Sequence, residues 1–388
     1  MSHSIHLTHI LHVVGARPNF MKVAAVLRAL STRAAMKQTL VHTGQHYDAN
    51  MSDVFFRQLG IPAPDVSLAV GSGSHAWQTA EVMTRLEPVV RQSEPDVVVV
   101  YGDVNSTVAA ALVCAKLNVP VAHVEAGLRS FDRTMPEEIN RLVTDQLSDL
   151  LLTPSLDGNQ NLAREGIPPE KVVFVGNVMI DTLVRLLPLA VGTVRRKLPK
   201  PYGLLTLHRP SNVDDPEMLG SILEALSAFS DEMDIRFPVH PRTRQRLHEL
   251  GMNRLCQGRL RLMDPLPYLE FLGLQHGATC VITDSGGIQE ETTFLGVPCL
   301  TVRENTERPV TVTLGTNTLV GRNMDLLAAE IRRILAGRGK IGTQPDLWDG
   351  KAGERIADCI LERYASVSPG ALIPASGQHL FAPAETPQ

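Results

Sequence analysis

Short apolar runs alternate with amphipathic stretches along most of the 388-residue chain. This alternation predicts buried strands joined by helices, which is typical of parallel sheets covered on both faces. The stretches Pro18–Leu30 and Ser106–Leu117 are the clearest predicted helices. The strands predicted in the first half are Ile10–Gly15, Gln38–Thr43, Val97–Tyr101, Val121–Val124 and Leu150–Thr153.

The pattern breaks around Leu186–Pro201, where a basic, proline-containing segment predicts a linker. We therefore expect an α/β fold of two Rossmann-like, doubly wound domains, residues 1–185 and 200–350, with a cleft between them. A helix over 351–368 is predicted to pack back on the first domain, and 369–388 are predicted to be a disordered tail. The strands predicted in the second half are Tyr202–Leu207, Arg236–Pro238, Leu260–Leu262, Cys280–Thr283 and Pro298–Val302.

Composition narrows the class of protein. A formal net charge of −4 argues against nucleic-acid binding, because no basic surplus exists to neutralise phosphates. Five scattered cysteines without metal-ligand spacing suit a reduced, cytoplasmic protein. Neither a signal peptide nor an apolar run long enough to span a membrane is expected.

A glycine-rich turn follows a buried strand of the second half. Ser285, Gly286 and Gly287 lead directly into a helix, whose free N–H groups and positive dipole would favour a phosphate. Glu291 lies one turn into that helix, where it could accept ribose hydroxyls. The spacing is neither GxGxxG nor a Walker loop, which weakens NAD and ATP interpretations. A simple tight turn is an equally good explanation.

Charged residues also follow the strands of the first half, at the sheet edge where such domains bind ligands. Arg17 and Lys22 flank a helix start and could bind an anion, although a lone helix lysine is more often solvated. Asp103 could act as an acid or base, but capping the next helix is the commoner fate of such a residue. Glu125 ends a buried strand, which is costly for a carboxylate unless it is paired or functional.

Two further places carry candidate chemistry. Glu137 begins a helix after a proline, where compensation of the helix dipole is the simple explanation. His208 and Arg209 end another predicted strand, and a histidine there suits proton transfer or phosphate contact. His240 follows a weaker strand and is interpreted as a core or capping residue. His123 and Glu125 lack a third ligand at diagnostic spacing, so no metal site is predicted.

Taken together, the motifs resemble those of the non-hydrolysing UDP-N-acetylglucosamine (UDP-GlcNAc) 2-epimerases of bacteria and archaea. The resemblance covers about Leu11 to Gly321, and the order and number of the motifs make it specific. The motifs are GARPNFMK, TGQH, GDVNST, HVEAGLR, MPEEINR, GNVMID, LLTLHR, DSGGIQEE and NTERP.

The resemblance implies a glycosyltransferase-B-like fold, a homodimer and a role in polysaccharide biosynthesis, with UDP-GlcNAc converted to UDP-ManNAc. The first domain would hold the sugar and the second the UDP. By motif position, the family's catalytic group corresponds to Asp103, Glu125, Glu137 and His208. Its nucleotide-sugar contacts correspond to Arg17, Lys22, Phe271, Ser285, Gly286, Gly287, Glu291 and Arg308. A second, regulatory site of bacterial members corresponds to Gln45, Arg209 and His240, although the Tyr47 region departs from their pattern.

The expected chemistry needs neither metal nor cofactor. C2 of the sugar is not adjacent to a carbonyl, so its proton is nearly inert, and no dinucleotide fingerprint supports oxidation by NAD. Expulsion of UDP to a bound 2-acetamidoglucal, followed by re-addition, is the remaining route. A modified UDP-sugar, a hydrolysing epimerase, a glycosyltransferase of the same fold and a catalytically silent sugar-nucleotide binder are the alternatives.

Overall fold

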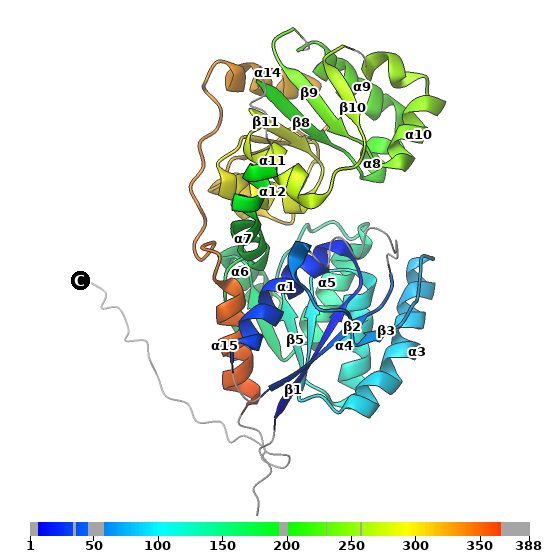
Figure 1. The fold of residues 1–388 in the computed structure, drawn as a ribbon, viewed down its shortest axis with the longest axis vertical. Coiled ribbons are helices and arrows are strands. Elements are labelled where there is room, and N and C mark those ends of the chain that lie inside the picture. The colour runs from blue at the N-terminus through cyan, green and yellow to red at the C-terminus, as the bar shows by residue number, and fades with distance from the viewer. Residues whose placement is uncertain are drawn as a thin grey trace, which may run out of the picture.

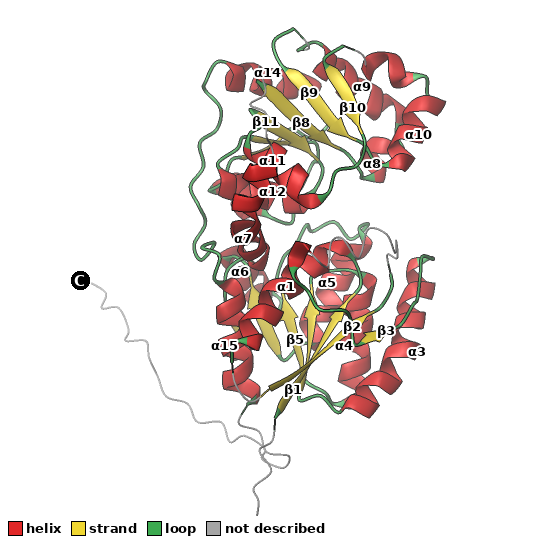
Figure 2. Cartoon of the chain, viewed as in Figure 1, coloured by secondary structure: helices red, strands yellow, loops and turns green. Residues whose placement is uncertain are grey.

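The computed structural model describes residues 7–33, 36–45, 58–193, 201–229, 231–256 and 258–365. Two parallel sheets, each covered by helices on both faces, lie one above the other in Figure 1, and Figure 2 separates their strands from the surrounding helices. The predicted α/β fold is confirmed. None of the described helices is long and apolar enough to cross a membrane.

The first sheet is built from runs such as Val97–Val100, which is inaccessible to solvent because helices cover both faces. Its strand order is β3-β2-β1-β4-β5-β6-β7. The strands are β1 (Thr8–Val14), β2 (Met36–His42), β3 (Val66–Ser67), β4 (Val97–Tyr101), β5 (Val121–Val124), β6 (Leu150–Thr153) and β7 (Val172–Phe174). The helices are α1 (Arg17–Ser31), α3 (His75–Ser93), α4 (Asn105–Leu117), α5 (Pro136–Leu147), α6 (Leu156–Arg164) and α7 (Val178–Thr193), with a 3-10 turn at Pro169–Lys171.

The second sheet has the order β10-β9-β8-β11-β12-β13. Its strands are β8 (Tyr202–Thr206), β9 (Asp234–Pro238), β10 (Leu260–Met263), β11 (Cys280–Thr283), β12 (Cys299–Thr301) and β13 (Asn317–Leu319). Its helices are α8 (Pro210–Val213), α9 (Pro216–Ser227), α10 (Pro241–Glu249), α11 (Tyr268–His276), α12 (Gly286–Leu295), α13 (Pro309–Thr313) and α14 (Met324–Leu335), with a 3-10 turn at Met252–Cys256.

The predicted linker at Leu186–Pro201 is wrong over its first half, because α7 continues to Thr193. Pro188 cannot donate the usual helical hydrogen bond, but Leu186 and Ala190 on either side are fully buried, and this packing keeps the segment helical. Leu272 of α11, a helix of the second half, lies in the same core as these α7 residues. Helix α7 therefore links the two halves (Figure 1).

Helix α15 (Ala352–Tyr364) closes the described chain. After α14 the backbone runs back past the second sheet to the first, where α15 lies beside α1 (Figure 1). Ile356 and Ile360 of α15 are buried in the core that α1 also lines.

Each sheet has a point where the strand order reverses, β1–β4 in the first and β8–β11 in the second. Loops that leave neighbouring strands in opposite directions open a crevice there, at the carboxyl ends of the strands. The segments after β4, β5, β8 and β11 carry the charged residues singled out by the sequence. These ends position the candidate site.

Candidate active site

Glu125 is the central residue of the candidate site. It directly follows β5 with φ of +73°, a left-handed conformation that is uncommon outside glycine. Its backbone N–H donates to the carbonyl oxygen of Leu152 at 3.0 Å. The side chain is only 4% exposed, and Lys22 of α1 places Nζ 2.7 Å from its Oε2. Arg308, which precedes α13 in the second half of the chain, places its Nη2 3.2 Å from Oε1 of Glu125.

Arg308 is held by carboxylates on three sides. Its Nε lies 2.9 Å from Oε1 of Glu290, and its Nη1 pairs with Glu307. Although burial acts in the opposite direction, Arg308 and Arg303 hold the pKa of Glu307 well below its ordinary value. A Cβ on Gly286 would come 2.4 Å from Nη1 of Arg308, so a side chain there would displace the guanidinium. The start of α12, Arg308 and Glu125 therefore meet at one point between the sheets.

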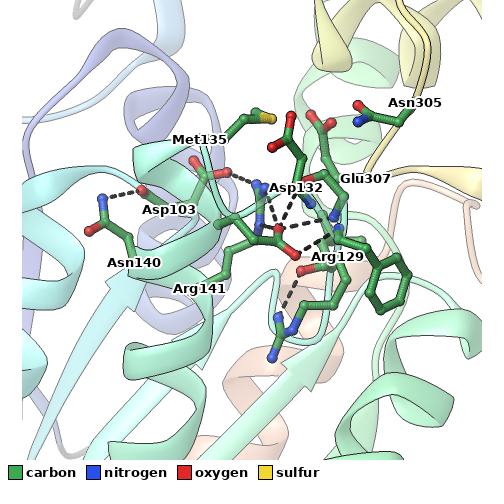
Figure 3. A network of polar contacts seen from close by, with 12 residues as sticks. Asp103, Arg129, Asp132, Met135, Asn140, Arg141, Asn305 and Glu307 are labelled. Carbon is green, nitrogen blue, oxygen red and sulfur yellow. Dashed lines mark hydrogen bonds and ion pairs between the residues drawn. The ribbon is translucent and has the colours of Figure 1, made fainter.

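Asp103 pairs with Arg141 of α5, and Figure 3 shows the two side chains facing each other. Asp103 does not cap α4, whose N-cap is Val104 without a side-chain hydrogen bond. Arg141 also contacts Glu138, with Nη2 2.8 Å from Oε2. Glu138 accepts the N–H groups of Ser130 at 3.0 Å and of the next residue at 2.8 Å, so it holds the loop before α5.

Glu137 is half-buried in the first turn of α5. It lies next to Glu138 but belongs to a different part of the helix surface, since successive helical residues point in different directions.

His208 follows β8, and its Nδ1 lies 2.7 Å from Oδ1 of Asp284 after β11. The imidazole is 57% exposed, whereas Asp284 is fully buried. The Asp284 carboxylate also accepts the N–H of His208 at 3.1 Å and of Arg209 at 3.0 Å. Burial alone would raise the pKa of Asp284, but His208 and these hydrogen bonds lower it. A buried carboxylate thus fixes the orientation of an accessible imidazole.

Two adjacent buried carboxyl groups lie on α12. Burial raises the pKa of Glu290 to about 7 despite the nearby Arg308, and the charge of Glu125 adds to the increase. Burial likewise raises the pKa of Glu291 to about 7, although the Tyr268 hydroxyl donates to its Oε1 at 2.8 Å. Both side chains can therefore change protonation near neutral pH.

The remaining residues predicted to contact the nucleotide sugar lie mainly on helices that cover the second sheet. Ser285 is the N-cap of α12 and makes no side-chain capping bond, which leaves the first N–H groups of the helix available. A Cβ on Gly287 would face open space. Phe271 of α11 is half-buried against a small apolar cluster. Arg17 is the first residue of α1, and its side chain lies outside the described residues.

The three residues of the predicted regulatory site have separate local roles. Gln45, buried after β2, accepts the hydroxyl of Ser106 at 2.8 Å. Arg209 donates from Nε to the carbonyl oxygen of Asp284 at 3.1 Å. His240 caps α10, where its Nδ1 accepts the N–H of Arg242 at 3.3 Å. Tyr47 lies outside the described residues. Within the described ranges, no group of three or more His, Cys, Asp or Glu side chains is arranged to hold a metal ion.

A family model described as UDP-N-acetylglucosamine 2-epimerase matches residues 28–361. The chain belongs to the UDP-N-acetylglucosamine 2-epimerase family. The crystal structure of *Methanocaldococcus jannaschii* UDP-GlcNAc 2-epimerase in complex with UDP-GlcNAc and UDP superposes with a TM-score of 0.85 at 41% identity. The match covers 92% of this chain and all of that one.

One further relative of this epimerase-family chain and one structural neighbour are informative. The *Pseudomonas aeruginosa* UDP-2,3-diacetamido-2,3-dideoxy-D-glucuronate 2-epimerase is 43% identical over 354 residues, covering 90% of this chain and 98% of that one. A lipopolysaccharide outer core galactosyltransferase has a TM-score of 0.51 at 13% identity, over 93% and 96% of the chains, which shows a shared fold alone.

Several polar residues of this family member were missed by the sequence reasoning. Arg141 and Glu290 stand inside the MPEEINR and DSGGIQEE motifs, yet only their neighbours were singled out. For Arg141 a signal existed, since it lies three residues after Glu138, the spacing at which the two side chains pair on the helix. For Glu307 and Glu290 the contact with Arg308 depends on tertiary structure, and no local spacing indicates it.

Proposed function

We propose that this chain is a non-hydrolysing 2-epimerase that interconverts UDP-GlcNAc and UDP-ManNAc. The observation that carries the proposal is the buried Glu125 carboxylate, paired with Lys22 of α1 and with Arg308, which precedes α13 in the second half of the chain. A carboxylate at this position could exchange a proton with a sugar carbon, and the two cations are proposed to stabilise the departing diphosphate. Membership of the epimerase family supports the same conclusion.

In the proposed reaction, the bond between C1 and the UDP oxygen breaks and the C2 proton passes to an enzyme carboxylate. The products are bound 2-acetamidoglucal and UDP. A proton then returns to C2 on the opposite face, and the UDP oxygen re-forms the bond to C1. Asp103, Glu125 and Glu137 are the proposed acids and bases, and they would also stabilise positive charge at C1.

Departure of UDP calls for compensation of developing negative charge. Arg308, Lys22 and the free N–H groups at the start of α12 supply donors and cations without a divalent ion. His208, oriented by Asp284, is proposed to contact the diphosphate or transfer a proton to it. Phe271 is proposed to pack near the uracil, Glu291 to bind the ribose and Arg17 to assist at the phosphates.

The experiment is to incubate the purified protein with UDP-GlcNAc alone and separate the products by anion-exchange chromatography. Accumulation of UDP-ManNAc without free UDP is the expected result. Free UDP with N-acetylmannosamine would contradict the proposal in favour of a hydrolysing enzyme. Turnover only after addition of an acceptor sugar would favour a glycosyltransferase.

A second substrate is favoured by one observation, the 43% identity to the *P. aeruginosa* enzyme named for a 2,3-diacetamido uronic acid. The same assay with that UDP-sugar tests it. A kcat/KM higher than for UDP-GlcNAc would reassign the sugar while leaving the reaction unchanged.

We also propose a cytoplasmic homodimer. The free cysteines of the described chain, Cys114, Cys256, Cys280, Cys299 and Cys359, suit a reducing compartment. A largely apolar groove of about 490 Å³ between α3 and α5, lined by Met83 and Ile139 among others, offers a surface for a second copy. Light scattering of the purified protein measures the oligomeric state, and a monomer at micromolar concentration would contradict the proposal.

A further inference from the structure

A buried pair of side chains joins two of the loops that carry candidate acids. His123 is the third residue of β5, and Asp145 lies near the end of α5; both are fully buried. Nδ1 of His123 is 2.6 Å from Oδ1 of Asp145. On its other side, Nε2 of His123 lies 2.8 Å from the carbonyl oxygen of Gly102, the residue before Asp103.

Both ring nitrogens of His123 therefore face groups that accept hydrogen bonds. A carbonyl oxygen can only accept, and an ionised carboxylate can only accept. Burial alone would raise the pKa of Asp145, but His123 and Arg129 lower it, so the carboxyl is ionised. Contacts at both ring nitrogens fix the orientation of the imidazole. The network continues through Arg129, which pairs with Asp145 and, at 2.7 Å, with Glu165.

The second oxygen of Asp145 reaches the loop of Glu125. Oδ2 accepts the N–H of Gly127, two residues after Glu125, at 3.1 Å and lies 2.7 Å from Nη2 of Arg129. Gly127 has φ of +82°, and a Cβ there would come 2.5 Å from the carbonyl oxygen of Gly158, so this loop has little freedom. The helix that carries Asp145 also begins with Glu137. The hydrogen-bonded pair of His123 and Asp145 thus connects the segments that bear the three candidate carboxylates.

We propose that His123 and Asp145 are positioning residues that fix the three candidate carboxylates relative to one another. The inference rests on the proposed epimerase function, because it assigns the carboxylates a shared reaction. Neither side chain reaches solvent, so neither would touch the substrate. Reacting groups must be held to within about 1 Å, and a displacement of that size can lower a rate about 100-fold.

The chain supplies a matched control at the opposite end of the same strand. Oδ2 of Asp149 accepts the N–H of Val121, the first residue of β5, at 3.1 Å. It is a similar carboxylate-to-backbone bond, but at the amino end of the strand, away from the site. The substitutions Asp145→Asn and Asp149→Asn each remove one charge and keep the shape of the side chain.

For Asp145→Asn we expect kcat for UDP-GlcNAc to fall about 10- to 100-fold. The Kd for UDP should change far less than kcat, since most of the proposed UDP contacts lie in the second half of the chain, around α11, α12 and Arg308. Asp149→Asn should keep the wild-type kcat even if its Tm is lower. A folded Asp145→Asn variant with wild-type kcat would overturn the inference. If Asp145→Asn does not fold, His123→Gln carries the same expectation, because a glutamine cannot bridge Asp145 and Gly102 through a rigid ring.

Failure of the proposed function would be recognised separately. A wild-type chain that is inert toward UDP-GlcNAc would contradict the function, and the pair would then be judged from crystal structures of the wild type and Asp145→Asn. Displacement of the Glu125 carboxylate by about 1 Å or more would support the positioning role. An unchanged Glu125 position would overturn it.

Discussion

At the scale of single residues, the site depends on groups that are costly to bury and are therefore paired. Lys22 was predicted to bind an anion, although a lone helix lysine is more often solvated; in the structure it is buried and pairs with Glu125. The sequence did indicate Glu125, because a carboxylate at the end of an apolar strand needs a partner. It could not identify that partner, since Arg308 lies 183 positions further along the chain.

The substitution Glu125→Gln keeps the size of the side chain and removes its ability to take up a proton. We expect epimerisation to fall by roughly 100- to 10,000-fold, the range for loss of a general acid or base. UDP binding, measured by calorimetry, should stay close to that of the wild type. Glu94→Gln is the control, because Glu94 also has a left-handed backbone, with φ of +43°, but is exposed at the end of α3. An active Glu125→Gln variant would remove Glu125 from the reaction.

Glu291 gives a prediction about stability. Its pKa is raised from 4.5 to about 7, so the folded chain binds this proton more tightly than the unfolded chain. The carboxyl therefore lowers stability progressively as pH rises from about 4.5 to about 7. The free energy of unfolding of Glu291→Gln, relative to the wild type, should increase over this window by up to about 3 kcal/mol. Urea denaturation at pH 5 and pH 8 measures it, with the exposed Glu87→Gln as control; a flat difference would contradict the prediction.

At the scale of elements, most strands were predictable, and those that were missed are among the shortest. The predicted bounds of β4, β5, β6 and β11 match the structure. The strands β3, β7 and β13 have only two or three residues, too few for a period to appear. The linker was predicted from Leu186 onward, but α7 continues to Thr193: Pro188 is a local signal against a helix, and the packing that overrides it is tertiary.

The start of α12 gives the prediction at this scale. The substitution Gly286→Ala would place a methyl group where Nη1 of Arg308 now lies, so the guanidinium must move. We expect weaker UDP binding and an epimerisation rate lowered about 10-fold or more, since a misplaced group of this kind lowers rates steeply. Gly192→Ala in α7 is the control, because a Cβ there meets nothing within 4 Å. Equal UDP affinities of the two variants would contradict the importance of this close approach.

At the scale of the whole molecule, the site forms between the two sheets, from side chains of both halves of the chain. The fold class and the motifs could be predicted from the sequence, because strand periodicity and local loops are short-range features. The ion pairs between Arg308 and Glu125, and between Arg141 and Asp103, require the folded arrangement. The boundaries of the two domains and the roles of the candidate residues stay predictions.

The central claim is that C2 loses and regains a proton while UDP stays on the protein. Incubation with UDP-GlcNAc in D₂O, followed by proton NMR, tests it most directly. The account predicts UDP-ManNAc that carries deuterium at C2, without accumulation of free N-acetylmannosamine. Epimer that retains its original C2 proton would contradict the proposed exchange with solvent through the carboxylates, and an unchanged substrate would contradict the assignment of UDP-GlcNAc.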